Sequence, residues 1–110
     1  MSGAEQADGW FDQLMQINGD SFAAGRYEVA YHALMAALHA AQDQGDPDLL
    51  RRVGLTAEQQ QVRIDADSPT HRLASSEAHK HGAMGIFRMA ARQASARATM
   101  VQHDRHAHGG

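Results

Sequence analysis

The stretch Gly25–Gly45, GRYEVAYHALMAALHAAQDQG, decides the fold of this chain. On a helical wheel of about 100° per residue it forms two apolar stripes, one of bulky and one of small side chains. The bulky stripe contains Tyr27, Ala30, Tyr31, Leu34, Leu38 and Ala41, and the small stripe contains Val29, Ala33, Ala36 and Ala40. A helix that is apolar over most of its circumference is usually buried between neighbours. We therefore predict a central helix whose small stripe lets a second helix, from the same chain or from a partner subunit, approach closely.

Glycines bracket this helix, and the residues that follow it indicate a second one. Gly45 stands where a glycine commonly ends a helix in the left-handed conformation. Asp46 is suited to accept hydrogen bonds from the first free N–H groups of a new helix, and Pro47 to occupy its first position. The sequence therefore predicts a helix end at Gly45 and a restart at Pro47.

A first helix is predicted over about Gly9–Ala24, with Asp8 as its N-cap. Its apolar residues follow helical spacing and are Trp10, Phe11, Leu14, Ile17 and Phe22. We interpret Trp10, the sole tryptophan, as a core anchor. The connection Ala24–Arg26 is short enough to require a tight turn, so the first two helices should form an antiparallel hairpin.

The second half of the chain is expected to form a surface helix and then a closing helix. The surface helix starts at Pro47, is broken or kinked at Gly54, and ends in the loop-like run Asp65–Thr70, DADSPT. The closing helix starts between Thr70 and Ser76, or else after Gly85, and ends near Val101. Its apolar stripe contains Ala83, Met84, Phe87, Ala90, Ala91, Ala94, Ala98 and Val101.

Composition predicts a single all-α domain of three to four antiparallel helices. The 110 residues suffice for one modest core, aromatic residues are only 5%, and no stretch alternates apolar and polar residues as a strand would. We expect residues 1–8 to be a disordered tail, residues 9–101 the helical domain, and residues 102–110 a flexible histidine-rich tail. Cysteine, a signal-like leader and a membrane-length apolar run are all absent from the sequence, so we expect a cytoplasmic location.

Charge is divided unevenly along the chain. Residues 1–50 carry eight acidic side chains against Arg26 alone, whereas residues 51–110 carry nine basic and five acidic side chains. Clustered lysine and arginine are typical of nucleic-acid binding, but here the basic residues are spread out and only Lys80 is a lysine. We interpret the division as an acidic hairpin that packs beside a basic helix, and we do not expect a nucleic-acid partner.

Part of the first hairpin resembles a tetratricopeptide repeat. The resemblance covers residues 14–47 and rests on Phe22, on the pattern Gly25-x-Tyr27-x-x-Ala30, and on Leu34, Ala37 and Leu38. The sequence departs from the repeat at Asn18, where a small glycine is usual, and at Pro47, which comes several residues late. No second copy follows. The resemblance implies a helical hairpin of this geometry and a role in protein–protein contact.

Eight histidines raise the question of metal or proton binding. Glu28 with His32, and His39 with Asp43, are i, i+4 pairs along one polar band, a spacing that favours carboxylate–imidazole hydrogen bonds. His32 and His39 lie about 10.5 Å apart along a helix axis, which is too far to share one ion. A metal site would need ligands from another helix, for which the candidates are His71, His79 and His81. We expect structural or solvated histidines, with metal binding or pH sensing as the alternative.

Arg97 and His103, separated by five residues, resemble the Arg-x4–6-His motif of the HEPN ribonucleases. That resemblance implies stabilisation of a phosphate oxygen by Arg97 and acid–base catalysis by His103. Ala98 stands where such families often place a polar residue. The sequence contains no phosphate-binding loop, nucleophile elbow or paired metal-binding acids. We therefore predict no catalytic residue, no cofactor and no enzymatic activity.

The leading hypothesis is a small non-catalytic interaction or structural module that binds a protein partner or itself. An alanine stripe with few bulky aromatic side chains to cover it favours a homodimer. The alternatives are a histidine-based metal-binding or pH-sensing protein and, behind it, a ribonuclease. The candidate metal ligands are Glu28, His32, His39 and Asp43.

Overall fold

The computed structural model describes the backbone of residues 3–109 and the side chains of residues 9–105. Within residues 3–109 the chain forms α-helices and no strands, which confirms the predicted all-α class. The helices are α1 (Gly3–Ala23), α2 (Tyr27–Gln44), α3 (Pro47–Asp67), α4 (Ser75–Lys80) and α5 (Ile86–Gly109). Residues 1, 2 and 110 of the two predicted tails lie outside the described backbone.

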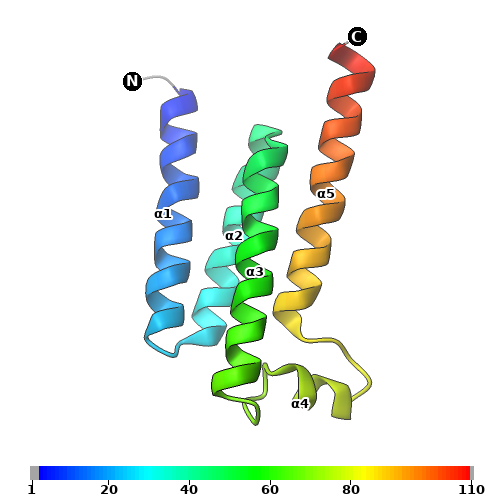
Figure 1. Cartoon of the computed structure of the whole chain (residues 1–110). Helices are drawn as coiled ribbons and strands as arrows, with labels where there is room; N and C mark the ends of the chain where they lie inside the picture. Colours follow the sequence, from blue (N-terminus) through cyan, green and yellow to red (C-terminus); the bar gives the residue numbers. More distant parts are fainter. Residues whose placement is uncertain (1–2, 110) are drawn as a thin grey trace.

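Successive long helices run in opposite directions along one axis (Figure 1). The pairs α1–α2 and α3–α5 make the most extensive contacts, so the fold consists of two hairpins placed side by side. α2 and α3 lie in the middle, α1 and α5 on the outer sides, and α4 at the lower end (Figure 1). The molecule measures 48 × 31 × 16 Å along its principal axes, and α4 lies at the end opposite both ends of the chain.

The junction between α2 and α3 follows the local sequence signals. Gly45 adopts the left-handed conformation at φ 64°, and its N–H donates to the carbonyl of Gln42. The Asp46 carboxylate accepts hydrogen bonds from the backbone N–H groups of Asp48 at 3.0 Å and Leu49 at 3.4 Å. Pro47 occupies the start of α3. The predicted helix stop, N-cap and restart are therefore confirmed.

The outer ends of α1 and α5 extend beyond the predicted boundaries. α1 begins at Gly3 rather than Gly9, so Asp8 lies inside the helix and is not its N-cap. α5 continues to Gly109 rather than ending near Val101. Neither extension contains a proline, and most of the added residues have adequate helix propensity, so no local signal stops either helix.

The hydrophobic core is filled mainly by alanine and leucine, with one phenylalanine from each hairpin. Phe11 of α1 and Phe87 of α5 are the largest fully buried side chains. The interpretation of Trp10 as a core anchor is wrong, because Trp10 is 56% exposed whereas Phe11 is 1% exposed. The two residues differ by about 100° on the helix, and only Phe11 faces α3, where the guanidinium of Arg52 lies 5.1 Å from its ring centroid.

Two buried amides join α1 to α3 through the core. The Asn18 amide nitrogen donates to the carbonyl of Ala30 at 2.8 Å and to the side-chain oxygen of Gln60 at 3.0 Å. The Gln60 amide returns a hydrogen bond to the Asn18 side-chain oxygen at 2.7 Å. Because both amides are satisfied, their burial is compatible with a stable core.

α3 is continuous through Gly54, contrary to the expected break or kink. Gly54 is buried against α5, and a Cβ added there would meet the carbonyl oxygen of Ala91 at 3.5 Å and the Cβ of Ala94 at 3.5 Å. The glycine therefore marks close helix packing. The helix also includes Asp65, Ala66 and Asp67, so the loop begins at Ser68, three residues later than predicted. Pro69 follows immediately, as the sequence indicated.

The closing helix is divided, because α4 ends at Lys80 and α5 starts only after Gly85. The side-chain oxygen of Gln61, a residue of α3, accepts hydrogen bonds from the N–H groups of Phe87 at 3.1 Å and Arg88 at 3.3 Å. A Cβ on Gly85 would lie 2.4 Å from that same oxygen. Of the two predicted starts, the one after Gly85 is correct, and the N-cap is supplied by another helix.

Gln61 and Asp65 form a polar hub that joins α3, α4 and α5. The Gln61 amide donates to the carbonyl of Leu73 and to the carboxylate of Asp65, each at 3.1 Å. The other donors to Asp65 are the backbone N–H of Ser75 at 2.7 Å and its hydroxyl at 2.6 Å. Burial raises the pKa of the Asp65 carboxyl, but these hydrogen bonds outweigh burial and hold the pKa below its usual value.

Candidate interaction surfaces

The predicted histidine band lies on the exposed side of α2. Glu28 does not pair with His32, because its carboxylate forms an ion pair with Arg72. The His32 ring instead packs edge-on against Tyr31, with 5.4 Å between ring centroids. His39 and Asp43 are exposed. Within the part of the chain whose side chains are described, no three histidine or carboxylate groups are placed to hold a metal ion.

Arg97 and His103 both lie on α5 but have different surroundings. The Arg97 guanidinium donates to the side-chain oxygen of Gln42 on α2, and thus links the two hairpins. His103 is exposed. The structure therefore gives Arg97 a packing role, and the ribonuclease hypothesis stays a prediction.

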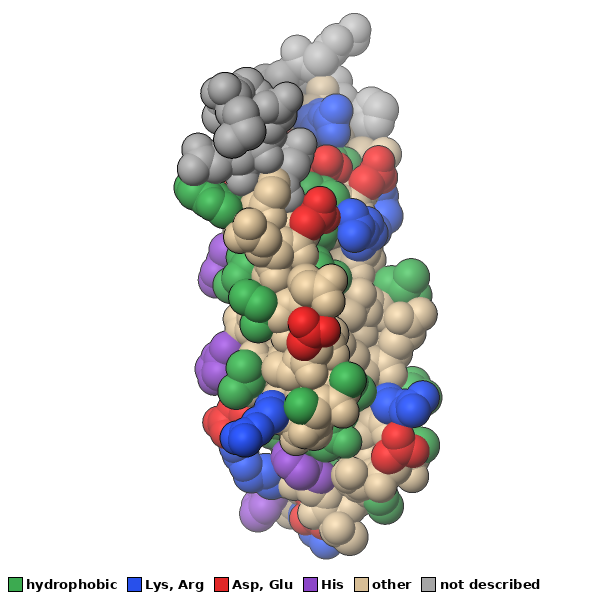
Figure 2. All heavy atoms as spheres, turned by 90° about the vertical axis from the view of Figure 1, so that its left-hand side faces the viewer, with side chains coloured by type: hydrophobic (Ala, Val, Ile, Leu, Met, Phe, Trp, Pro, Cys, Tyr) green, Lys and Arg blue, Asp and Glu red, His purple; other side chains and the backbone are tan. Residues whose placement is uncertain are grey.

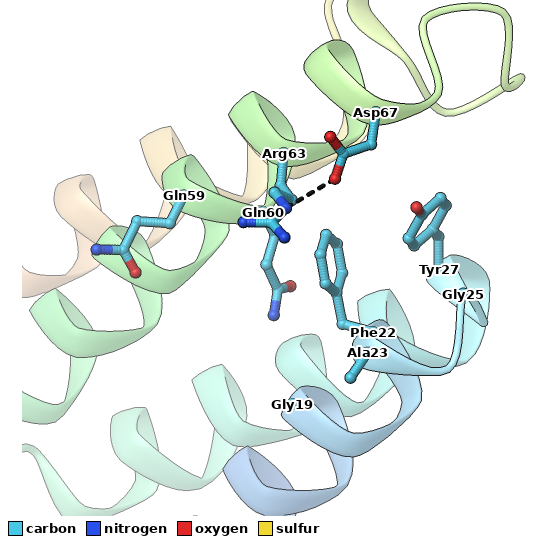
Figure 3. Close-up of a pocket in the computed structure, with 9 residues that line it drawn as sticks. All are labelled: Gly19, Phe22, Ala23, Gly25, Tyr27, Gln59, Gln60, Arg63 and Asp67. Atoms are coloured by element: carbon cyan, nitrogen blue, oxygen red, sulfur yellow. Dashed lines mark hydrogen bonds and ion pairs between the residues drawn. The ribbon is translucent and has the colours of Figure 1, made fainter.

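A cleft of about 420 Å³ lies between the end of the first hairpin and the second half of α3 (Figure 3). Phe22 and Tyr27 project from the hairpin toward α3, and Arg63 and Asp67 lie opposite them on α3 (Figure 3). The complete lining is Gly19, Phe22, Ala23, Gly25, Tyr27, Gln59, Gln60, Arg63 and Asp67. Small residues thus form the hairpin rim of this α1/α3 cleft, and polar side chains form the α3 rim.

The α1/α3 cleft combines an aromatic floor with a neutral polar rim. The rings of Phe22 and Tyr27 are tilted by 41° with their centroids 4.9 Å apart. Arg63 and Asp67 form an exposed ion pair at 2.7 Å, so their charges largely cancel. Among the described lining residues there is no histidine, serine or cysteine, and the single carboxylate is already paired. The chemistry of the cleft is that of binding rather than of bond making.

A second surface is the outer face of the first hairpin. On α1, Trp10 and Ile17 are seven residues apart, lie on one side of the helix, and are at least half exposed. On the neighbouring α2, the exposed Val29 and the half-buried Ala36 and Ala40 continue the apolar surface. We call these five residues the hairpin stripe. Figure 2, viewed from the α1 side, shows apolar side chains following one another down the left of this face, beside histidines at its edge.

Sequence reasoning missed the cleft, because its two walls come from helices that are not consecutive. The glycine and alanine at positions 19 and 23 and the glutamine run 59–61 were visible, but no local pattern places them opposite each other. The small stripe of α2 was recognised as an approach surface. The structure shows that α1 covers only part of it, because Ala33 is buried whereas Val29 stays exposed.

Comparisons with known proteins return no relative. No family model matches the chain, and neither a curated protein nor a solved structure matches it. In the described part of the chain, every helix is too short or too polar to span a bilayer. The two surfaces are therefore the features of the described chain that bear on its function.

Proposed function

We propose that the chain is a non-catalytic interaction module whose α1/α3 cleft receives a bulky apolar side chain from a segment of a partner protein. The observation that carries this proposal is the lining of the cleft. An aromatic floor lies between small residues on one rim and amide and paired charged side chains on the other.

The size and polarity of the cleft suit a side chain. Its volume of about 420 Å³ falls in the lower range of ligand sites, which usually have apolar walls and a few polar groups that fix orientation. Phe22 and Tyr27 offer ring faces and edges for an apolar or aromatic group. The exposed amide of Gln59 offers a donor and an acceptor to a peptide backbone.

A protein segment fits the cleft better than a free small molecule does. Gly25, Gln59, Arg63 and Asp67 are all exposed, so the cleft is open along its rims. A small ligand gains affinity when most of its surface is buried, and an open cleft buries less of it. A peptide would make further contacts on the exposed surfaces of α1 and α3 on either side of its anchor side chain. The neutral rim favours an uncharged anchor.

The test uses two glycines of α1 as a matched pair. A Cβ added at Gly19 or at Gly9 meets no atom within 4 Å, so a side chain can start at either position without a clash at Cβ. Gly19 lines the cleft and Gly9 does not. Both changes should raise helix propensity by similar amounts. Gly19→Leu therefore fills the cleft, and Gly9→Leu serves as its control.

The probe is a phage-displayed library of random peptides, selected on the full chain, with the best peptide then labelled and titrated by fluorescence anisotropy. We expect the selected peptides to share one bulky apolar residue. Gly19→Leu should weaken binding about tenfold or more, because it competes for the same buried surface, and Gly9→Leu should leave it unchanged. Equal binding by both variants, or selected peptides without an apolar anchor, would refute the proposal.

A further inference from the structure

We propose that the hairpin stripe binds a second copy of this chain, and that the two copies are related by a two-fold axis perpendicular to α2. This inference is independent of the proposed peptide binding, because the stripe and the α1/α3 cleft lie on opposite sides of α1. Its starting point is a set of large exposed apolar side chains. Trp10, Ile17 and Val29 are each at least half exposed on one face.

The relative levels of the stripe residues follow from the hairpin itself. Asn18 of α1 donates to the carbonyl of Ala30 at 2.8 Å, so these residues lie at the same height along the molecule. Counting from this pair along the two antiparallel helices places Trp10 at the height of Leu38, and Ile17 at that of Tyr31. Trp10 therefore lies near the Ala40 end of the stripe, and Ile17 lies near the Val29 end.

A two-fold axis makes this arrangement self-complementary. The midpoint between Val29 and Ala40 on α2 falls between Leu34 and Met35. The midpoint between Trp10 and Ile17 on α1 lies at the same height, so a two-fold axis in the interface, perpendicular to both helices, packs α1 against α1 and brings Trp10 of one copy onto Ile17 of the other. The same operation packs α2 against α2 and brings Val29 of one copy to the small side chain of Ala40 in the other. Bulky side chains thus meet smaller ones in both halves of one isologous interface.

The charges at the two ends of the stripe obey the same symmetry. Arg26 lies at the Val29 end, where both residues line one small hollow. Asp43 lies at the Ala40 end. Both are exposed, and neither forms an ion pair with another described side chain. The midpoint between Arg26 and Asp43 also falls between Leu34 and Met35, so the proposed axis brings each arginine to the partner's aspartate.

Polar side chains surround the stripe as a rim. His32 and His39 border it on α2, and Gln13, Gln16 and Asp20 border it on α1. An apolar centre inside a polar rim is the usual anatomy of a protein interface. The Asp20 carboxylate accepts a hydrogen bond from the Gln16 amide at 2.9 Å and so is paired within α1 rather than with Arg26. The Arg26 guanidinium is therefore available to the partner. A second copy is the occupant that satisfies shape and charge together.

The first experiment measures mass by light scattering over a range of concentrations, together with the emission of Trp10. We expect a dimer at high concentration and a blue shift of the tryptophan emission as it forms, because the ring leaves water. The double change Trp10→Ser with Ile17→Ser should give a monomer. Its matched control is Leu55→Ser with Val62→Ser, two equally exposed residues seven apart on α3, which should remain dimeric.

A charge exchange tests the symmetry rather than the apolar contact. Arg26→Asp or Asp43→Arg alone should raise the dimer dissociation constant about tenfold, since each change places like charges together at both ends of the interface. The double variant should recover the original value, because the exchanged charges attract again. A wild-type monomer at every concentration, a dimer lost only with the α3 control, or a double variant weaker than either single one would overturn the inference.

Discussion

Replacement of Gln61 by leucine should destabilise the fold more than any other single change of an amide to an apolar side chain of similar size. Gln61 makes four hydrogen bonds from a fully buried position, two to the N-terminus of α5 and one each to Leu73 and Asp65. Leucine fills a similar volume, so the change removes polar partners without leaving a large cavity. The buried N–H of Phe87 would lose its acceptor.

The size of the effect follows from the groups that are left unpaired. A buried polar group without a partner costs about 1–3 kcal/mol. The N–H of Phe87 is buried and the groups of Arg88 and Leu73 are half-buried, so we expect a loss of about 2–5 kcal/mol. For a chain of this size that corresponds to a fall in melting temperature of roughly 8–20 °C.

The assay is urea denaturation followed by far-ultraviolet circular dichroism, which gives the free energy of unfolding and its urea dependence. Gln59→Leu is the control, because Gln59 belongs to the same helix and is exposed. The control should change the stability by less than about 0.5 kcal/mol. If Gln61→Leu lies within about 1 kcal/mol of Gln59→Leu, the hub does not hold α5 in place and the reasoning fails.

Three further substitutions test the two buried glycines, Gly54 and Gly85, and the carboxylate of Asp65. Gly54→Ala should be neutral or stabilising by up to about 1 kcal/mol, because its Cβ would make ordinary contacts with α5. Gly85→Ala should destabilise about as much as Gln61→Leu, since its Cβ would displace the Gln61 amide; equal melting temperatures for the two alanine variants would contradict this contrast. Asp65→Asn should make the free energy of unfolding depend less steeply on pH in the acid range. The folded pKa of Asp65 is depressed, so its stabilisation is present above the unfolded pKa of about 3.9 and is lost as the pH falls through the folded value. Urea titrations of both proteins between neutral pH and about pH 3 test this, and parallel curves would refute it.

The sequence predicted correctly those features that are determined by residues close together in the chain. Gly45, Asp46 and Pro47 are consecutive, and each acts on its own backbone or on the next turn, so the α2–α3 junction could be predicted from the sequence. Most of the apolar stripe of α5 was predicted for the same reason, because Phe87, Ala90, Ala94 and Ala98 follow helical spacing and are buried. The first two residues of the predicted stripe, Ala83 and Met84, precede the helix.

Errors arose where a distant residue decides the outcome. Gln61 caps α5 from 26 positions away, and this long-range hydrogen bond fixes where the helix starts. Trp10 and Phe11 are adjacent and equally apolar in character, and only the position of α3 determines which of them is buried. The α1/α3 cleft depends on the same packing of non-consecutive helices. Helix periodicity supplies a face but does not say which neighbour covers it.

The buried Asn18–Gln60 pair limits how the first hairpin can slide along α3. A shift by one helical turn would move Asn18 about 5.4 Å from Gln60. The surrounding alanine and leucine side chains would find equivalent apolar neighbours after such a shift, so the hydrophobic effect alone distinguishes the two alignments only weakly. The two amides would then be buried without partners, at about 1–3 kcal/mol each. In a core this rich in alanine, the amide pair selects a single register from several that would bury similar apolar area.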